Sequence, residues 1–187
     1  MNNIYDVRGN HGSGKSTLVR NILKRNQNEL ILDEEIPYHL IPEFNLCIIG
    51  RYDRRGGGVD AISKSSDELQ SFIEKKVKAH NVLFEGIITS EVYTRWNELA
   101  EGTDYNYTFF FLNVDLDTSI ERVEQRRLAA GNSKEFNHKN ITAKYVQIGR
   151  AINKLRESGK TVKELKTPSQ KEAYQAIMKL IRRGSKC

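Results

Sequence analysis

The stretch Arg8-Gly9-Asn10-His11-Gly12-Ser13-Gly14-Lys15-Ser16-Thr17 follows an apolar-alternating run, Ile4-Tyr5-Asp6-Val7, near the start of the chain. It fits the pattern G-x-x-x-x-G-K-[ST], in which a glycine-rich loop joins a strand to a helix and its backbone N–H groups converge on phosphate oxygens. Helical spacing of apolar residues resumes directly afterwards, at Leu18, Ile22 and Leu23. The stretch therefore predicts a strand, a phosphate-binding loop and a helix, and with them a site for ATP or GTP.

The residue types within this loop predict separate roles. Lys15 is expected to reach the β- and γ-phosphates and so to act in catalysis, and the Ser16 hydroxyl is expected to ligate Mg²⁺. The N-terminus of the following helix also favours anions through its dipole. The residues expected to bind the nucleotide are Gly9, Asn10, His11, Gly12, Ser13, Gly14, Lys15, Ser16 and Thr17.

Length and composition limit the class of protein. At 187 residues the chain suits one well-cored domain, and we expect a single domain over 1–187. The longest apolar runs, such as Phe109–Leu112, are far too short for a membrane span, so no membrane association is expected. No secretory signal precedes the loop, and two cysteines, Cys47 and Cys187, do not make a disulfide scaffold. The expected compartment is the cytoplasm.

The charge balance points to a partner. The formal net charge of +6 and the pI near 9.3 exceed what nucleotide binding requires. A polyanion such as DNA is therefore an expected partner. A merely basic, soluble surface is the alternative, and composition leaves both open.

Apolar runs of strand length alternate with amphipathic helical stretches, which is typical of an α/β protein with a parallel sheet. We expect a three-layer sandwich around a five-stranded, mainly parallel sheet. A small β-hairpin is expected where Pro42–Asn45 separates two apolar runs. The expected strands lie near 3–8, 46–50, 81–85, 107–113 and 161–165, and the expected helices near 15–26, 66–79, 90–100, 117–129, 141–158 and 169–183.

Two further segments carry functional residue types. The apolar run Asn81–Phe84 ends in Glu85, where a carboxylate would orient Mg²⁺ in a phosphate-loop protein; a surface glutamate is the alternative. Arg122 and Arg126 lie one helical turn apart and could neutralise a transferring phosphate. We expect them in a helical lid at about 122–140, with a solvated helix face as the alternative.

These three segments together resemble the phosphate loop, acidic strand end and lid of small nucleoside, nucleotide and polynucleotide kinases. Within that group, Ile49-Gly50-Arg51-Tyr52-Asp53 followed by Gly56-Gly57-Gly58-Val59-Asp60 is similar to bacteriophage kinases that phosphorylate 5-hydroxymethyluracil in DNA. The resemblance implies transfer of the ATP γ-phosphoryl group to a base hydroxymethyl group, with ATP and Mg²⁺ as cofactors and DNA as substrate. The basic charge fits a DNA substrate better than a free nucleotide.

A hydroxyl acceptor needs a carboxylate that orients it and takes its proton. Asp53, just past the second expected strand, is the first candidate, and Asp60 is the second. Glu85 could serve both the metal and the proton in a compact site. The alternative for Asp53 is capping or pairing with a neighbouring arginine.

Two other functions share these features. A (deoxy)nucleoside or nucleoside monophosphate kinase would need the same loop and lid. A non-enzymatic, ATP-dependent DNA-binding module would need the same loop and basic surface. The lid arginines and the nearby acids favour a kinase that acts on nucleic acid. A GTPase is disfavoured, because Asn153-Lys154-Leu155-Arg156 lacks the acidic fourth residue of a guanine-reading motif.

Overall fold

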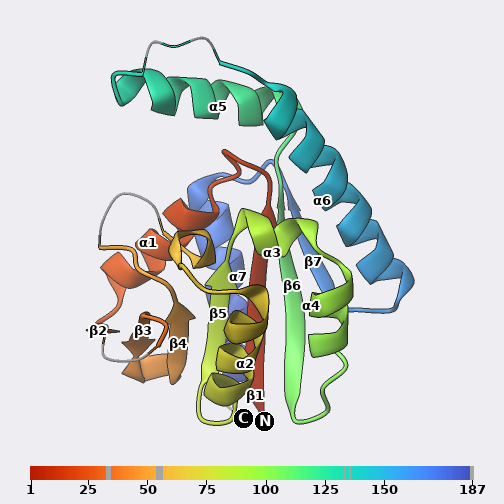
Figure 1. Ribbon diagram of the computed structural model, residues 1–187. Helices are drawn as coiled ribbons and strands as arrows, with labels where there is room; N and C mark the ends of the chain where they lie inside the picture. The colour runs from red at the N-terminus through yellow and green to blue at the C-terminus, as the bar shows by residue number, and fades with distance from the viewer. Residues whose placement is uncertain (33–34, 54–56, 133, 135, 186–187) are drawn as a thin grey trace.

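The computed structural model describes residues 1–32, 35–53, 57–132, 134 and 136–185. Within them one seven-stranded sheet has the order β2-β3-β4-β5-β1-β6-β7 (Figure 1). No helix in these ranges is long and apolar enough to cross a membrane. The strands are β1 (Asn2–Gly9), β2 (Glu29–Ile31), β3 (Tyr38–Ile41), β4 (Leu46–Ile49), β5 (Asn81–Glu85), β6 (Tyr105–Asn113) and β7 (Val162–Lys166).

The parallel part of the sheet contains the five strands expected from the sequence. β4, β5, β1, β6 and β7 pair in parallel in this order. The expected hairpin is also present, because β3 and β4 pair antiparallel across a turn at Pro42–Phe44. The expected count of five strands is too low: β2 pairs antiparallel with β3 and extends this edge of the sheet. β2 has only three residues, too few for an alternating pattern to stand out.

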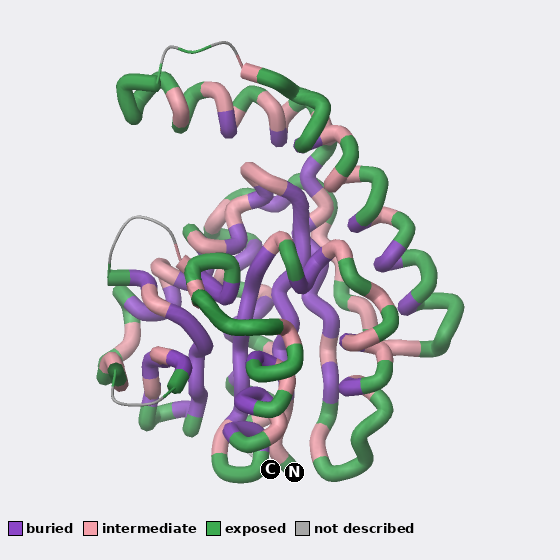
Figure 2. Tube along the Cα trace, in the orientation of Figure 1, coloured by how far each residue is buried: buried purple, intermediate pink, exposed green. Residues whose placement is uncertain are grey.

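Helices cover both faces of the sheet, as expected for a three-layer sandwich. α1 and α7 pack on one face through residues such as Ile22 and Ile177, and α2, α4 and α6 pack on the other through Phe72, Trp96 and Ile152. The central strands β1, β4, β5 and β6 are the most buried part of the sheet, whereas the edge strands β2 and β7 have no buried residue (Figure 2). The helices are α1 (Lys15–Arg25), α2 (Ser66–Val77), α3 (Ile87–Glu91), α4 (Thr94–Leu99), α5 (Leu116–Ala129), α6 (Lys139–Glu157) and α7 (Gln170–Gly184).

One expected helix is divided. The segment 90–100 does not form a single helix, because α3 ends at Glu91 and α4 begins at Thr94. The Arg8 side chain explains the break: its Nη1 donates to the carbonyl oxygens of Ser90 and Val92, at 3.4 and 3.1 Å. These two carbonyl oxygens would accept hydrogen bonds from backbone N–H groups in a continuous helix, and here they accept from the Arg8 side chain instead.

α5 lies apart from the sandwich. It crosses above the carboxyl ends of the strands, over the loop that follows β1, and α6 then descends along the sheet (Figure 1). Ser119 and Val123 are its only buried side chains. Most of the surface of α5 consequently faces solvent or the space above the loop (Figure 2).

Candidate active site

The phosphate loop starts where β1 ends and closes at the first turn of α1. Gly14 has φ 93° and ψ 10°, a left-handed conformation that favours glycine, and it forms the N-cap of α1. Lys15 follows with only 5% of its surface exposed. Its Nζ donates to the carbonyl oxygens of Gly9 (2.7 Å) and Asn10 (3.2 Å), so the side chain folds back over the loop. Burial lowers the pKa of Lys15, and the Glu85 carboxylate acts in the opposite direction.

Glu85 lies beside the loop because β5 is the neighbour of β1. Val7 and Glu85 are paired in the register of the two strands. The Glu85 Oε1 accepts hydrogen bonds from Ser16 Oγ (2.8 Å) and Tyr52 Oη (3.3 Å), and the side chain is almost fully buried. Burial raises the pKa of Glu85, while Lys15 and the Ser16 hydrogen bond lower it.

The loop after β4 passes directly over Glu85. Gly58 has φ 71°, and a Cβ added to it would lie 2.4 Å from Glu85 Oε1. No side chain fits there without displacing the carboxylate. The position therefore requires glycine both for its backbone angle and for its contact with Glu85.

Ser16 and Glu85 supply a donor set that fits Mg²⁺. Their oxygens are hydrogen-bonded to each other and are of the hard type that this cation prefers. The described residues contain no group of three or more His, Cys, Asp or Glu side chains that could hold a metal. Mg²⁺ does not need one, because it commonly keeps several waters and binds one or two protein oxygens together with substrate phosphates.

A cavity of about 960 Å³ opens above the loop, beneath α5. It lies at the upper end of the size range of small-molecule and cofactor sites. Loop residues form its floor and basic residues of α5 line it from above. Its lining residues are Asn10, His11, Gly12, Ser13, Gly14, Lys15, Ser16, Thr17, Arg20, Asp60, Glu85, Ile87, Arg122, Arg126, Arg127, Ala130, Asn132, Pro168, Ser169 and Gln170.

Most candidate residues from the sequence line this cavity. Gly9 does not line it, although its carbonyl oxygen accepts from Lys15. Asp53 is the main departure, because it is exposed, is not among the lining residues, and pairs with Arg51. The Arg51 Nε to Asp53 Oδ1 distance is 3.0 Å. Asp53 is therefore paired as the alternative from the sequence expected, and its catalytic role stays a prediction. Arg54–Gly56, which follow it, lie outside the described residues.

Asp60 does line the cavity. It sits in a short 3-10 helix, Val59–Ala61, and its side chain is exposed. Its two carboxylate oxygens accept from the backbone N–H groups of Ile87 (2.7 Å) and Ile88 (3.1 Å). Asp60 consequently caps α3 just after Glu85 and Gly86, and this fixes a second carboxylate on the cavity wall.

The lid arginines face the phosphate loop. Arg122 Nη1 donates to the Gly12 carbonyl oxygen at 3.2 Å, and Arg126 lines the same cavity. His11 lies among these cations. Burial lowers the pKa of His11, and the positive charges of Lys15 and Arg126 lower it further. This cluster of positive charge favours an anionic ligand.

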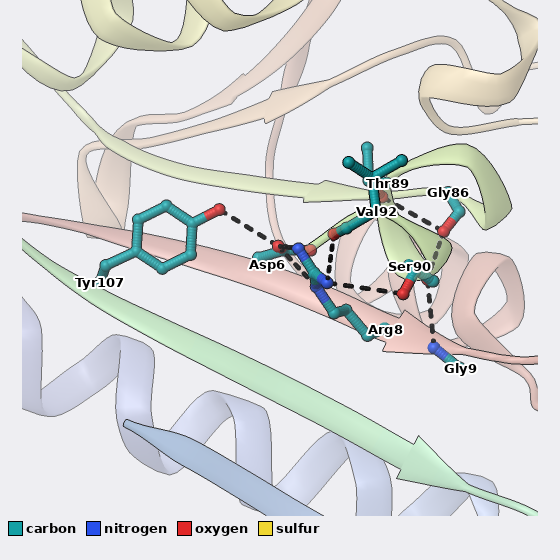
Figure 3. A network of polar contacts seen from close by, with 8 residues as sticks. All are labelled: Asp6, Arg8, Gly9, Gly86, Thr89, Ser90, Val92 and Tyr107. Carbon is teal, nitrogen blue, oxygen red and sulfur yellow. Dashed lines mark hydrogen bonds and ion pairs between the residues drawn. The ribbon is translucent and has the colours of Figure 1, made fainter. Parts of the chain in front are cut away.

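A buried ion pair lies under the loop (Figure 3). Asp6 and Arg8 are both fully buried on β1, and the Arg8 Nε to Asp6 Oδ2 distance is 2.8 Å. Tyr107 Oη donates to the same carboxylate oxygen at 3.1 Å. Burial raises the pKa of Asp6, and the Arg8 charge opposes this. The pair fixes the position of the guanidinium group inside the core.

From there the network reaches the loop itself (Figure 3). Arg8 holds the carbonyl oxygens of Ser90 and Val92. Ser90 Oγ accepts from the Gly9 N–H at 3.3 Å and donates to the Gly86 carbonyl oxygen. One hydroxyl therefore joins the first residue of the phosphate loop to the residue after Glu85.

Sequence reasoning missed several of these residues. Tyr52 lies in Ile49–Asp53, a motif that carries a family resemblance but predicts no role for the tyrosine. Its hydroxyl contacts Glu85, and its ring centre lies 5.9 Å from the Arg20 guanidinium. Ser90 and Arg8 carry no motif at all. Gln170, at the start of α7, lines the cavity only because β7 brings the chain back beside β6. These contacts arise from the tertiary fold.

Comparison with known proteins identifies the family. The family model for "5-hmdU DNA kinase" matches residues 1–175. The 5-hmdU DNA kinase of Pseudomonas phage PaMx11 is 30% identical over 195 residues, covering 95% of this chain and 96% of the relative. The chain belongs to the 5-hmdU DNA kinase family. It is therefore a kinase, a phosphotransferase that uses a nucleotide.

Other relatives have the same name. The 5-hmdU DNA kinase of Pseudomonas phage M6 is 29% identical, covering 86% of this chain and 89% of the relative. The 5-hmdU DNA kinase 1 of Salmonella phage ViI is 26% identical, covering 78% of this chain and 67% of the relative. Among solved structures, deoxyadenosine kinase from M. mycoides with bound dCTP aligns with a TM-score of 0.49 and 13% identity, covering 96% of this chain and 99% of that one.

Proposed function

We propose that this kinase transfers the γ-phosphoryl group of ATP to the hydroxymethyl group of 5-hydroxymethyluracil in DNA. The observation that carries the proposal is one cavity that joins a phosphate loop, two carboxylates and the arginines of α5. Phosphoryl transfer needs these three elements together. The names of the relatives supply the identity of the acceptor, and their phage origin suggests action in the cytoplasm of an infected cell.

The loop holds the donor in this mechanism. Its backbone N–H groups and the α1 N-terminus bind the phosphates. Lys15 Nζ, which donates to the carbonyl oxygens of Gly9 and Asn10, donates to phosphate oxygens when the nucleotide is bound. Ser16 and Glu85 would hold Mg²⁺, which when bound reduces the negative charge around the transferred group. Arg122 and Arg126 stabilise the charge that develops on the equatorial oxygens. We assign the lid role to 122–140, of which 133 and 135 lie outside the described residues.

Asp60 is the carboxylate that we assign to the acceptor hydroxyl. It lines the cavity, whereas Asp53 does not, and Glu85 already serves the metal. The hydroxyl proton passes to Asp60 as the oxygen attacks the γ-phosphorus, and the bond from that phosphorus to the bridging oxygen breaks to release ADP. Asp53 remains the second candidate, since its loop follows β4 at the same edge of the sheet.

Incubation with labelled ATP and four acceptors tests this proposal. The acceptors are hydroxymethyluracil-containing duplex DNA, the same duplex with thymine, that thymine duplex with free 5′-hydroxyl ends, and free hydroxymethyldeoxyuridine or its monophosphate. We expect label only in the hydroxymethyluracil duplex, in base-linked phosphate. Preferred labelling of the free nucleoside or nucleotide, or of DNA ends, would contradict the acceptor. ATP-dependent DNA binding without transfer to any acceptor would contradict the kinase mechanism.

A further inference from the structure

The layer formed by α1 and α7 carries an unusual concentration of positive charge. Together the two helices contain eight Lys or Arg residues and one Glu, a formal charge of +7, whereas the whole chain carries +6. The rest of the chain is therefore close to neutral. The single acid, Glu172, is engaged in the capping box of α7 with Ser169.

Six of these cations are exposed, and none forms an ion pair within the described part of the chain. On the opposite layer, α6 has Lys144 and Arg156 paired with Glu91 and Glu164, whereas its Lys139, Arg150 and Lys154 form no ion pair with the described residues. We call these six residues the α1/α7 basic face: Lys24, Arg25, Lys171, Lys179, Arg182 and Arg183.

The α1/α7 basic face extends from Lys171, next to the cavity residue Gln170, to the last turns of α1 and α7, where Gly184 lies beside Asn3 at the start of β1. The guanidinium of Arg25 on α1 lies 4.7 Å from the ring centre of Tyr174 on α7, so the two helices present one surface. Gln170, the first residue of α7, and Arg20, in the middle of α1, line the cavity. α7 has 15 residues and is roughly 22 Å long, which matches about six base pairs of duplex DNA.

We propose that the α1/α7 basic face binds the phosphate backbone of the DNA substrate outside the cavity. This inference rests on the proposed function. Unpaired cations on a surface beside the site would hold a long acceptor through phosphates, which position DNA without reading its sequence. Compensation of helix dipoles explains only the cations in the last turns, Lys24, Arg25, Arg182 and Arg183. It does not explain Lys171 and Lys179, or the lack of ion pairs.

Two charge-matched triple variants test the face. The face variant removes three exposed cations from α7: Lys179→Gln, Arg182→Gln and Arg183→Gln. The control variant removes three exposed cations from the α2/α6 layer: Lys78→Gln, Arg150→Gln and Lys154→Gln. For each, we would measure thermal stability, binding of a fluorescent duplex of about 30 base pairs across salt concentrations, and turnover of that duplex and of a trinucleotide, both with one hydroxymethyluracil.

The face variant should bind duplex DNA more weakly. The slope of log affinity against log salt is negative, and its magnitude should decrease by about 2.7 if all three cations contact phosphates. KM for the duplex should rise while kcat and trinucleotide turnover stay unchanged, because the trinucleotide is too short to reach beyond the cavity. The control should retain the wild-type salt slope and KM.

Three outcomes would overturn the inference: wild-type binding and salt slope in the face variant, an equal loss in the control, or an equal loss with the trinucleotide. Failure of the proposed function gives a different result, because wild-type protein would then leave hydroxymethyluracil unphosphorylated. Binding of the unmodified duplex would still distinguish the two faces in that case. Thermal stability is compared among wild type, the face variant and the control variant, so that a loss of binding can be distinguished from a loss of folding.

Discussion

At the scale of single residues, Lys15 is the first to test. Its ammonium group donates hydrogen bonds to two carbonyl oxygens of its own loop. Removing it should therefore affect phosphate binding more than the stability of the fold. We expect Lys15→Ala to reduce phosphoryl transfer by roughly 100-fold or more, as loss of a transition-state contact does. Lys78→Ala, which removes an exposed lysine at the end of α2, is the control and should keep wild-type turnover of the hydroxymethyluracil duplex. Undiminished transfer in purified Lys15→Ala would remove the basis of the proposed mechanism.

The two aspartates of the loop after β4 give the second prediction. Asp60→Asn should lose most transfer yet still bind ATP, because the amide lacks the charge that takes the proton. Its single oxygen can keep one of the two hydrogen bonds from α3. Asp53→Asn should weaken the pair with Arg51 and leave most transfer intact. Nucleotide affinity and transfer rate would be measured for both. A silent Asp60→Asn with an inactive Asp53→Asn would reverse the assignment.

Ser90 gives a third prediction at this scale. Its hydroxyl joins Gly9 to Gly86, so Ser90→Ala should loosen the loop relative to Glu85 and lower kcat more than it raises KM for ATP. The stability cost should be about 1–3 kcal/mol, because the Gly9 N–H is left unpaired. Thr89→Val is the control, since the Thr89 hydroxyl also donates to the Gly86 carbonyl oxygen but, unlike Ser90, accepts no hydrogen bond from Gly9. Equal kcat losses in both variants would indicate a purely structural role.

At the scale of elements, α2 and α7 begin with the same capping box, formed by Ser65 with Glu68 and by Ser169 with Glu172. Ser169 lines the cavity, whereas Ser65 does not. Ser65→Ala and Ser169→Ala should each lower the free energy of unfolding by about 1 kcal/mol. Only Ser169→Ala should also raise KM for ATP, because it loosens the α7 start at the cavity wall. Denaturation and steady-state kinetics on both variants check this difference.

The elements that follow from local patterns were predictable from the sequence. β1, the phosphate loop and α1 follow from one motif, and the parallel strands follow from their apolar runs. The division of 90–100 into α3 and α4 was not predictable, because it depends on the Arg8 guanidinium from β1. Local sequence also cannot show which of two aspartates in one loop faces the cavity. Asp53 and Asp60 look alike in the sequence, and only the fold shows that Asp60 caps α3 while Asp53 pairs with Arg51.

At the scale of the molecule, the strand order places the chemistry. β1 lies between β5 and β6: after β1 the chain continues to β2, β3 and β4 on one side, whereas after β5 it crosses to β6 on the other side. Ligands of such sheets bind at this point, where the order of the strands reverses. The phosphate loop, Glu85 and α5 all meet there. The α1/α7 basic face starts at the same edge, so the layer that completes the core also offers a surface for a long acceptor.

The stability of the whole molecule should depend on pH through His39. His39 is buried on β3 with its ring 6.0 Å from that of Tyr52, and burial lowers its pKa below 6.5. Folded His39 therefore stays neutral where the unfolded chain takes up a proton. Its contribution to stability is complete above pH 6.5 and is lost as the pH falls below 6.5 towards the folded pKa.

His39→Phe isolates this contribution, because phenylalanine keeps a ring against Tyr52 and does not titrate. We would measure the free energy of unfolding of both proteins by urea denaturation from about pH 8 to about pH 5. Groups that titrate in both proteins cancel in the difference. We expect the free energy of unfolding of wild type to fall relative to that of the variant as the pH decreases through this range. In wild type the unfolded chain takes up a proton on His39 more readily than the folded chain does, and the variant has no imidazole at this position. A difference that is independent of pH would mean that His39 binds protons equally in both states, and would contradict the burial argument.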